Sequence, residues 1–395
     1  MNTSPDRGTA APVELIDRLA DRLSAAGDLT RPEWRDALHA VPRHLFVPNR
    51  AWCVPDGPAE VAGHAIDRDA DPRGWWDAAY ADAAIITQVA DGDGDPATGE
   101  GAWTSSLSAP GAVTAFLELL YPLDGHRVLE IGTGTGWTAA LLSARLGDEH
   151  VTTIEVDPAV AEQAAANLRT AGYKPRLIIG DGADGAPDGA PYDRVHVSCG
   201  VTTVPYAWVQ QTRPGGVIVL PWMPEWQGGH KVRLAAVGDG RAIGRFHGSA
   251  SYMMLRAQRS TGLHVPDDPA AAPGAEETVT LLDPRSVVGD SYGADVAIAG
   301  MLPDVMGDAH RDGDGWCLLL ADTAGTSWAR CRHRPGAREH LVHQAGPRRL
   351  WDEVADAYLR WVGWGSPPRS RFGLTVDTTG QHIWRDDPGN IVTGS

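Results

Sequence analysis

The chain has 395 residues, of which 43% are hydrophobic and 22% are charged. This length predicts roughly two or three domains, and the composition excludes a disordered or fibrous protein. The 34 basic and 51 acidic residues give a formal net charge of −17, so nucleic acid and anionic membranes are not expected as partners.

The cysteines are far apart and form no CxxC pair, which is the pattern of reduced thiols rather than of disulfides: Cys53, Cys199, Cys317 and Cys331. No apolar run approaches the roughly 20 residues that span a bilayer, and residues 1–11 lack the features of a signal peptide. We therefore expect a cytoplasmic protein. The sequence leaves its oligomeric state open.

The first hundred residues predict helices followed by irregular chain. Leu15, Leu19 and Leu23 recur at helical spacing, and a second helix follows directly. Residues 50–103 are rich in Pro, Gly and Asp, which indicates a loop with one strand over 84–89.

Residues 112–221 alternate helical stretches with short apolar strands, which predicts a mainly parallel sheet with helices on both faces. The expected helices cover 112–120, 137–146 and 158–171, and the expected strands cover 127–131, 151–155, 176–179, 194–198 and 216–220.

After Pro221 the pattern changes to an antiparallel hairpin, a Pro-rich linker, short strands and one helix near 349–362. The chain is therefore expected to divide into an N-terminal helical and loop segment over 1–103, a core over 104–224 and a C-terminal α+β domain over 225–395.

The strongest local signal is a strand that runs through three glycines into a helix, Val128-Leu-Glu-Ile-Gly132-Thr133-Gly134-Thr-Gly136. Glycines at this place let a ligand approach the backbone beside a helix N-terminus. The GxGxG spacing lacks the GxGxxG register that seats a dinucleotide pyrophosphate. Glu130, just before the loop, is expected to orient it or to accept a hydrogen bond from an ammonium group.

The next two strands also end in carboxylates. Glu155 can accept hydrogen bonds from a ribose diol, and Asp181, followed by Gly182, can accept from an adenine amino group. A lone glycine loop is often only a tight turn, and an isolated Glu155 is often a solvated strand end. Three signals at consecutive strand ends instead favour a site for S-adenosylmethionine (AdoMet).

Several motifs occur in an order that resembles the protein-L-isoaspartate O-methyltransferase family, between about Arg43 and Pro221: Arg43-His-Leu-Phe-Val-Pro48, Ser106-Leu-Ser108-Ala-Pro110, Gly180-Asp-Gly182, Pro191-Tyr-Asp193 and Pro214-Gly-Gly216. The resemblance implies a class I, Rossmann-like α/β fold, with AdoMet as cofactor and S-adenosylhomocysteine as product. It also implies that Ser108 is the active-site serine and that Ser106 is a second hydroxyl near cofactor and substrate.

Segments of the C-terminal region resemble an extended branch of this family that acts on ribosomally synthesised, post-translationally modified peptides: 251–259, 350–354, 371–375 and 381–384. That resemblance implies methylation of an aspartyl side chain in a macrocyclic peptide, after which the ester closes to aspartimide. The alternatives are isoaspartyl repair and a non-catalytic scaffold that binds AdoMet.

Methyl transfer to a carboxylate needs alignment and desolvation rather than a general base, because the acceptor is ionised at neutral pH. The hydroxyls of Ser106 and Ser108 can orient one acceptor oxygen. The alternative role for Ser108 is to cap the helix expected over 112–120.

Two C-terminal patterns remain. Arginines are concentrated over 329–371 and can seat an acidic, cyclised precursor peptide, although a solvated face is the alternative: Arg330, Arg332, Arg334, Arg338, Arg348, Arg349, Arg360, Arg369 and Arg371. Cys331, His333, His340 and His343 include an HxxH spacing. Without a second cysteine or a helical frame, we expect no metal there.

Overall fold

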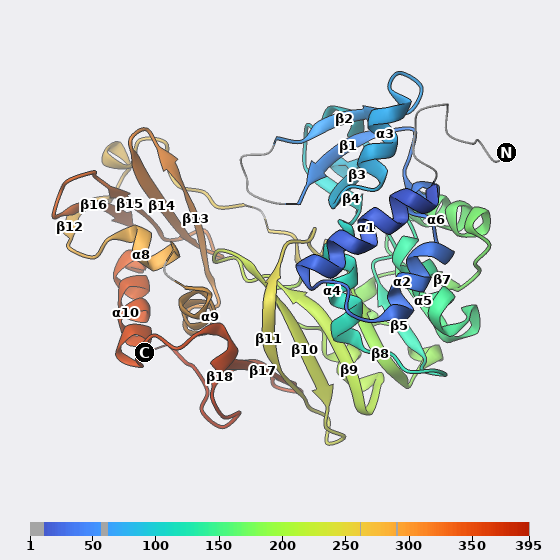
Figure 1. Ribbon diagram of the computed structural model, residues 1–395. Coiled ribbons are helices and arrows are strands. Elements are labelled where there is room, and N and C mark those ends of the chain that lie inside the picture. Colours follow the sequence, from blue (N-terminus) through green and yellow to red (C-terminus); the bar gives the residue numbers. More distant parts are fainter. Residues whose placement is uncertain (1–11, 57–61, 261, 290, 395) are drawn as a thin grey trace. The chain divides into compact units, whose positions relative to one another are not determined.

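The computed structural model describes residues 12–56, 62–260, 262–289 and 291–394 (Figure 1). Residues 1–11, where no signal peptide is expected, lie outside this range. The chain divides into a first unit, Met1–Cys199 with Gln210–Leu220, and a second unit, Gly200–Val209 with Pro221–Ser395. The main division thus falls a few residues before the expected position near 225. Across the described ranges, no helix is both long and apolar enough to cross a membrane.

The first unit contains a parallel sheet in the order β9-β8-β5-β6-β7. Apart from the longer β9, the strands have four to six residues, and most are buried along their length, as expected for strands covered by helices. Because parallel strands share a direction, their carboxyl ends meet at one edge of the sheet. The strands are β5 (Val128–Ile131), β6 (Val151–Glu155), β7 (Arg176–Ile179), β8 (Tyr192–Val197) and β9 (Thr212–Trp222).

Helices α4 (Pro110–Leu120), α5 (Trp137–Leu146) and α6 (Pro158–Ala171) pack against strands of this sheet. The predicted bounds of α5, α6, β6 and β7 agree with the structure end to end. Local signals explain this accuracy. Asp157, for example, caps α6 by accepting hydrogen bonds from the amides of Ala159 and Val160.

The N-terminal helices α1 (Pro12–Ala26) and α2 (Pro32–Ala40) are also confirmed. Leu19 and Leu23 of α1 are buried, and α2 packs against α5. These helices therefore belong to the same core as the sheet.

The expected loop over 50–103 is wrong, because this region forms most of an antiparallel sheet in the order β2-β1-β3-β4 (Figure 1). Only the strand over 84–89 was predicted. The short strands are separated by Gly- and Asp-rich turns, and their pairing joins distant segments, so the local pattern does not reveal it. The elements are β1 (Arg50–Pro55), β2 (His64–Asp67), α3 (Pro72–Ala79), β3 (Ala83–Val89) and β4 (Trp103–Leu107).

The second unit confirms the expected α+β character. Antiparallel pairing joins its strands in the orders β18-β17-β11-β10 and β12-β16-β15-β14-β13. The strands are β10 (Gly229–Ala236), β11 (Ala242–Ala250), β12 (Glu276–Thr280), β13 (Val305–Asp312), β14 (Gly315–Asp322), β15 (Trp328–His333), β16 (His340–Ala345), β17 (Phe372–Asp377) and β18 (Gly380–Arg385). The helices are α7 (Tyr206–Gln210), α8 (Pro284–Gly289), α9 (Tyr292–Met301) and α10 (Leu350–Gly363).

Candidate active site

The glycine loop leads from β5 into α5 and has no room for side chains. Gly132, Gly134 and Gly136 all have positive φ, at 90°, 54° and 88°. A Cβ atom on Gly132 would lie 2.9 Å from the Ser198 Oγ, and one on Gly134 would lie 3.2 Å from the Ser106 carbonyl oxygen. Glycine is therefore required here both by backbone conformation and by space.

The amides of this loop already have partners within the chain. Gly132 and Thr133 donate to the Ile154 carbonyl, Gly134 donates to the Glu155 carboxylate, and Gly136 donates to the Thr133 carbonyl. A loop that cradles a pyrophosphate needs such amides to be free. The arrangement therefore disfavours a dinucleotide and fits a phosphate-free nucleoside ligand.

Glu155, at the end of β6, is the centre of a chain of hydrogen bonds. Its Oε2 accepts from the Gly134 amide at 2.9 Å, and its Oε1 accepts from the Asp157 amide at 3.1 Å. Gln88 Nε2 on β3 donates to Asp157 Oδ2 at 3.2 Å, and Thr104 on β4 donates to Gln88 Oε1 at 2.9 Å. Burial raises the pKa of Glu155, and the two amide hydrogen bonds oppose that rise.

Glu130 on β5 is fully buried. Its Oε2 accepts from Thr153 Oγ1 at 2.7 Å, and Thr153 in turn contacts the Thr133 hydroxyl at 2.7 Å. Two hydroxyls thus link Glu130 to the glycine loop, and its expected role in orienting that loop stays a prediction. Its Oε1 is buried without a hydrogen-bond partner among the described residues, which fits the second role, acceptance from a cofactor ammonium group.

Asp181 follows β7 and is exposed, and its carboxylate accepts from the Ala183 amide at 2.9 Å, while Gly182 is buried. Burial raises the pKa of Cys199 to about 12, and the negative charges of Glu155 and Asp181 add to the rise. β6 and β7 are neighbouring parallel strands in which Glu155 pairs with Ile179, and the ribose and adenine roles of Glu155 and Asp181 stay predictions.

Ser106 lies on β4 and Ser108 just after it, so the sheet missed by the sequence analysis carries both candidate catalytic hydroxyls. Because the Ser106 carbonyl lies against Gly134, this strand runs beside the glycine loop. The alternative role for Ser108 is wrong: the N-cap of α4 is Ala109, and the Gly111 amide in its first turn donates to the Asp82 carboxylate at 2.7 Å.

Arg43 holds the serine segment in place, a role that sequence reasoning missed. Its side chain is 1% exposed and donates to the carbonyls of Ala79 at 2.9 Å, Ala83 at 2.7 Å and Ser108 at 3.0 Å. Burial lowers the pKa of Arg43 to about 10, so the group remains charged at neutral pH. Arg43 opens the motif quoted above, but only the fold reveals its partners. Gln88 was likewise missed, although it lies in a predicted strand.

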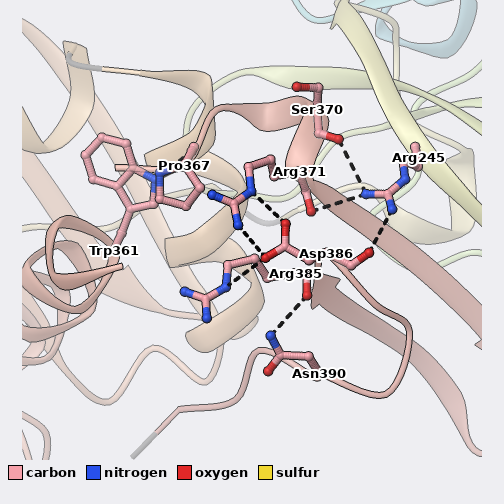
Figure 2. Close-up of polar contacts among 8 residues, drawn as sticks. All are labelled: Arg245, Trp361, Pro367, Ser370, Arg371, Arg385, Asp386 and Asn390. Carbon is pink, nitrogen blue, oxygen red and sulfur yellow. Dashed lines mark hydrogen bonds and ion pairs between the residues drawn. The ribbon is translucent and has the colours of Figure 1, made fainter. Parts of the chain in front are cut away.

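Ion pairs engage five of the nine arginines in the arginine-rich region of the second unit, and Arg330 and Arg332 share one carboxylate, that of Asp312. Carboxylates pair with Arg330, Arg332, Arg348, Arg349 and Arg371. Figure 2 shows one such group, in which Asp386 lies between Arg371 and Arg385 and its carbonyl accepts from Arg245 at 2.8 Å. This pairing favours the solvated-face alternative over a basic patch that seats an acidic peptide.

Replacing Gly134 by alanine is expected to weaken AdoMet binding at least about tenfold, because the methyl group meets the Ser106 carbonyl and strains the loop. Isothermal titration measures the affinity. Gly125→Ala is the matched control, since Gly125 also has a positive φ of 76° but no atom of the described chain lies within 4 Å of its added Cβ. Equal affinity in the two variants would contradict this account of the loop.

The buried Glu130 carboxyl is expected to make the stability of the apo chain fall as pH rises. Burial raises its pKa from 4.5 to about 8, so between these values the folded state binds more protons than the unfolded state. Unfolding free energy then decreases by up to about 1.4 kcal/mol per pH unit. Thermal midpoints measured from pH 5.5 to 8 should fall more steeply for the native chain than for Glu130→Gln. Parallel slopes would refute this prediction.

The comparisons with known proteins agree with this geometry. The protein-L-isoaspartate(D-aspartate) O-methyltransferase (PCMT) family profile matches residues 15–257. A protein-L-isoaspartate O-methyltransferase of Methanopyrus kandleri is 32% identical over 245 residues, which cover 60% of this chain and 90% of that protein. One of Methylorubrum extorquens is 36% identical over 256 residues, which cover 64% and 94% respectively.

A solved structure titled protein-L-isoaspartate O-methyltransferase aligns with 94% of this chain and all of its own, with a TM-score of 0.53 and 18% identity. The fold of the C-terminal region thus has a counterpart in that structure. With the family match over more than half of its length, the chain belongs to the protein-L-isoaspartate(D-aspartate) O-methyltransferase family of AdoMet-dependent carboxyl methyltransferases.

Proposed function

We propose that this protein transfers the methyl group of AdoMet to the free carboxylate of an isoaspartyl residue in a polypeptide. The observation that carries the proposal is the approach of the serine strand to the glycine loop, where the Ser106 carbonyl lies 3.2 Å from the Cβ position of Gly134. The strand that carries the Ser106 hydroxyl, with Ser108 directly after it, thereby lies next to the loop expected to hold the donor.

Methyl transfer to a carboxylate requires the chain to position the donor and the acceptor, and it does not require a general base. AdoMet supplies a methyl group on a positively charged sulfonium. Ser108 and Ser106 are proposed to donate hydrogen bonds to one acceptor oxygen, so that the other oxygen faces the methyl group near 3 to 3.5 Å. Arg43 is a positioning residue, since it contacts the Ser108 backbone and not the reacting atoms.

Once the methyl ester has formed, the substrate can close to a succinimide without a catalytic group from the enzyme. The backbone nitrogen of the following residue attacks the ester carbonyl, methanol leaves and a five-membered succinimide forms. In a damaged protein, hydrolysis of that ring regenerates some ordinary aspartate. The enzyme is therefore required only for the methylation.

Aspartimide formation in an acidic, cyclised ribosomal peptide is the second candidate, supported by the C-terminal segments that resemble the peptide-tailoring branch. Those segments supply core residues of the second unit, including Trp351, Phe372 and Trp384, each at most 3% exposed. Because these residues are buried in the core, their resemblance to the branch indicates a shared fold and gives no information about the substrate. A solved structure titled as an isoaspartyl enzyme also aligns with nearly the whole chain, so we rank isoaspartyl methylation first.

Ser108→Ala is expected to lower kcat roughly 10²-fold while leaving AdoMet affinity unchanged, because the hydroxyl is proposed to orient only the acceptor. Methyl transfer from labelled AdoMet gives kcat, and titration gives the affinity. Ser105→Ala is the control, because the Ser105 hydroxyl is buried on the neighbouring position of β4 and accepts from Thr87. Unchanged turnover in Ser108→Ala would remove this serine from the mechanism.

An unstructured test peptide with one isoaspartyl residue is expected to be methylated at least about tenfold faster than the same peptide with aspartate. Release of labelled methanol measures the reaction. Inactivity on both linear peptides, together with activity on a cyclised peptide, would favour aspartimide formation instead. Cofactor binding without any methyl transfer would favour the scaffold.

A further inference from the structure

Side chains from separate segments of the second unit meet at one end of its β12-β16-β15-β14-β13 sheet. Asp283, His333 and His340 each offer a ligand atom, and these atoms all lie within 4.8 Å of one another. Asp283 immediately precedes α8, His333 ends β15 and His340 begins β16. None of them contributes to the methyl-transfer site described above.

The fold explains why they meet. The register that pairs Arg332 with Leu341 puts His333 directly across from His340 at the last position before the hairpin turn. Their ring centroids are 5.0 Å apart. Helix α8 packs against β14 and β15, which brings Asp283 to the same end of the hairpin.

The two imidazoles are both buried. His333 is 7% exposed and His340 is 4% exposed. Among the described residues, His333 Nδ1 has no hydrogen-bond partner, an unusual state for a buried polar atom. Within the part of the chain that the structure describes, the Nδ1 of His340 accepts only a long contact of 3.4 Å, from the Arg334 amide.

Asp283 provides negative charge. Both oxygens of its carboxylate accept from Arg285: Oδ1 from the backbone amide at 2.9 Å and Oδ2 from the guanidinium at 2.6 Å. Arg285 is half exposed, so it can leave the carboxylate without a large cost in buried area. A cation that binds Asp283 must compete with this guanidinium.

We infer that Asp283, His333 and His340 bind one divalent transition-metal ion, with Zn²⁺ as the best match to their chemistry. Two imidazole nitrogens and one carboxylate oxygen suit Zn²⁺, whereas Mg²⁺ and Ca²⁺ prefer oxygen ligands alone. Three protein ligands leave one position for water. The ion would join the start of α8 to the β15–β16 turn, which makes the site independent of the proposed methyl transfer.

The test uses the full chain, stripped of metal by a chelator and dialysed, and titrates Zn²⁺ against a chromophoric indicator. We expect one equivalent to bind and to raise the thermal midpoint. His333→Ala should weaken binding at least about tenfold. His343→Ala is the control, because His343 lies on the same hairpin and completes the HxxH spacing, but contacts Glu277 at 3.1 Å instead.

Arg285→Ala provides a test in the opposite direction: removal of the competing guanidinium should tighten Zn²⁺ binding, whereas loss of a purely structural ion pair would not. Asp283→Asn serves as a second ligand variant if His333→Ala does not fold, as judged by circular dichroism. The proposal is overturned if the native chain binds less than one equivalent, or if His343→Ala loses as much affinity as His333→Ala.

Discussion

The candidate active site depends on one buried carboxylate. Glu155 holds the glycine loop through the Gly134 amide and the start of α6 through the Asp157 amide. A charge-assisted acceptor of this kind fixes two backbone segments at once, and the low exposure of Glu155 protects both bonds from water. The loop is thereby shaped before any ligand arrives, which is the preorganisation that transfer chemistry requires.

A second set of hydrogen bonds fixes the strand that carries Ser106, where the methyl acceptor is proposed to bind. Gln88 and Thr104 connect the antiparallel sheet to Asp157, and Arg43 holds the carbonyl of Ser108. Each contact joins segments distant in sequence, so the serine strand is fixed by long-range partners rather than by local propensity. The sheet that follows the N-terminal helices is therefore joined by hydrogen bonds to the segments of the candidate active site.

Many arginines of the second unit form ion pairs with carboxylates of the same unit. Arg371 and Arg385 share Asp386, and Arg348 pairs with Asp304, so nearby carboxylates offset part of the positive charge of this region. Exposed ion pairs of this kind contribute little to stability, but they weaken the positive potential that would attract an acidic partner. Substrate choice is therefore better sought in the acceptor geometry of the first unit.

The sequence by itself determined the parallel core and the positions of Gly132, Glu155 and Asp181 at its strand ends, because helical periodicity, caps and glycine turns are encoded over a few neighbouring residues. Only the tertiary structure decided the β2-β1-β3-β4 sheet, the role of Arg43 and the meeting of Asp283 with His333. These depend on pairings between segments far apart in the chain, for which local patterns hold no signal.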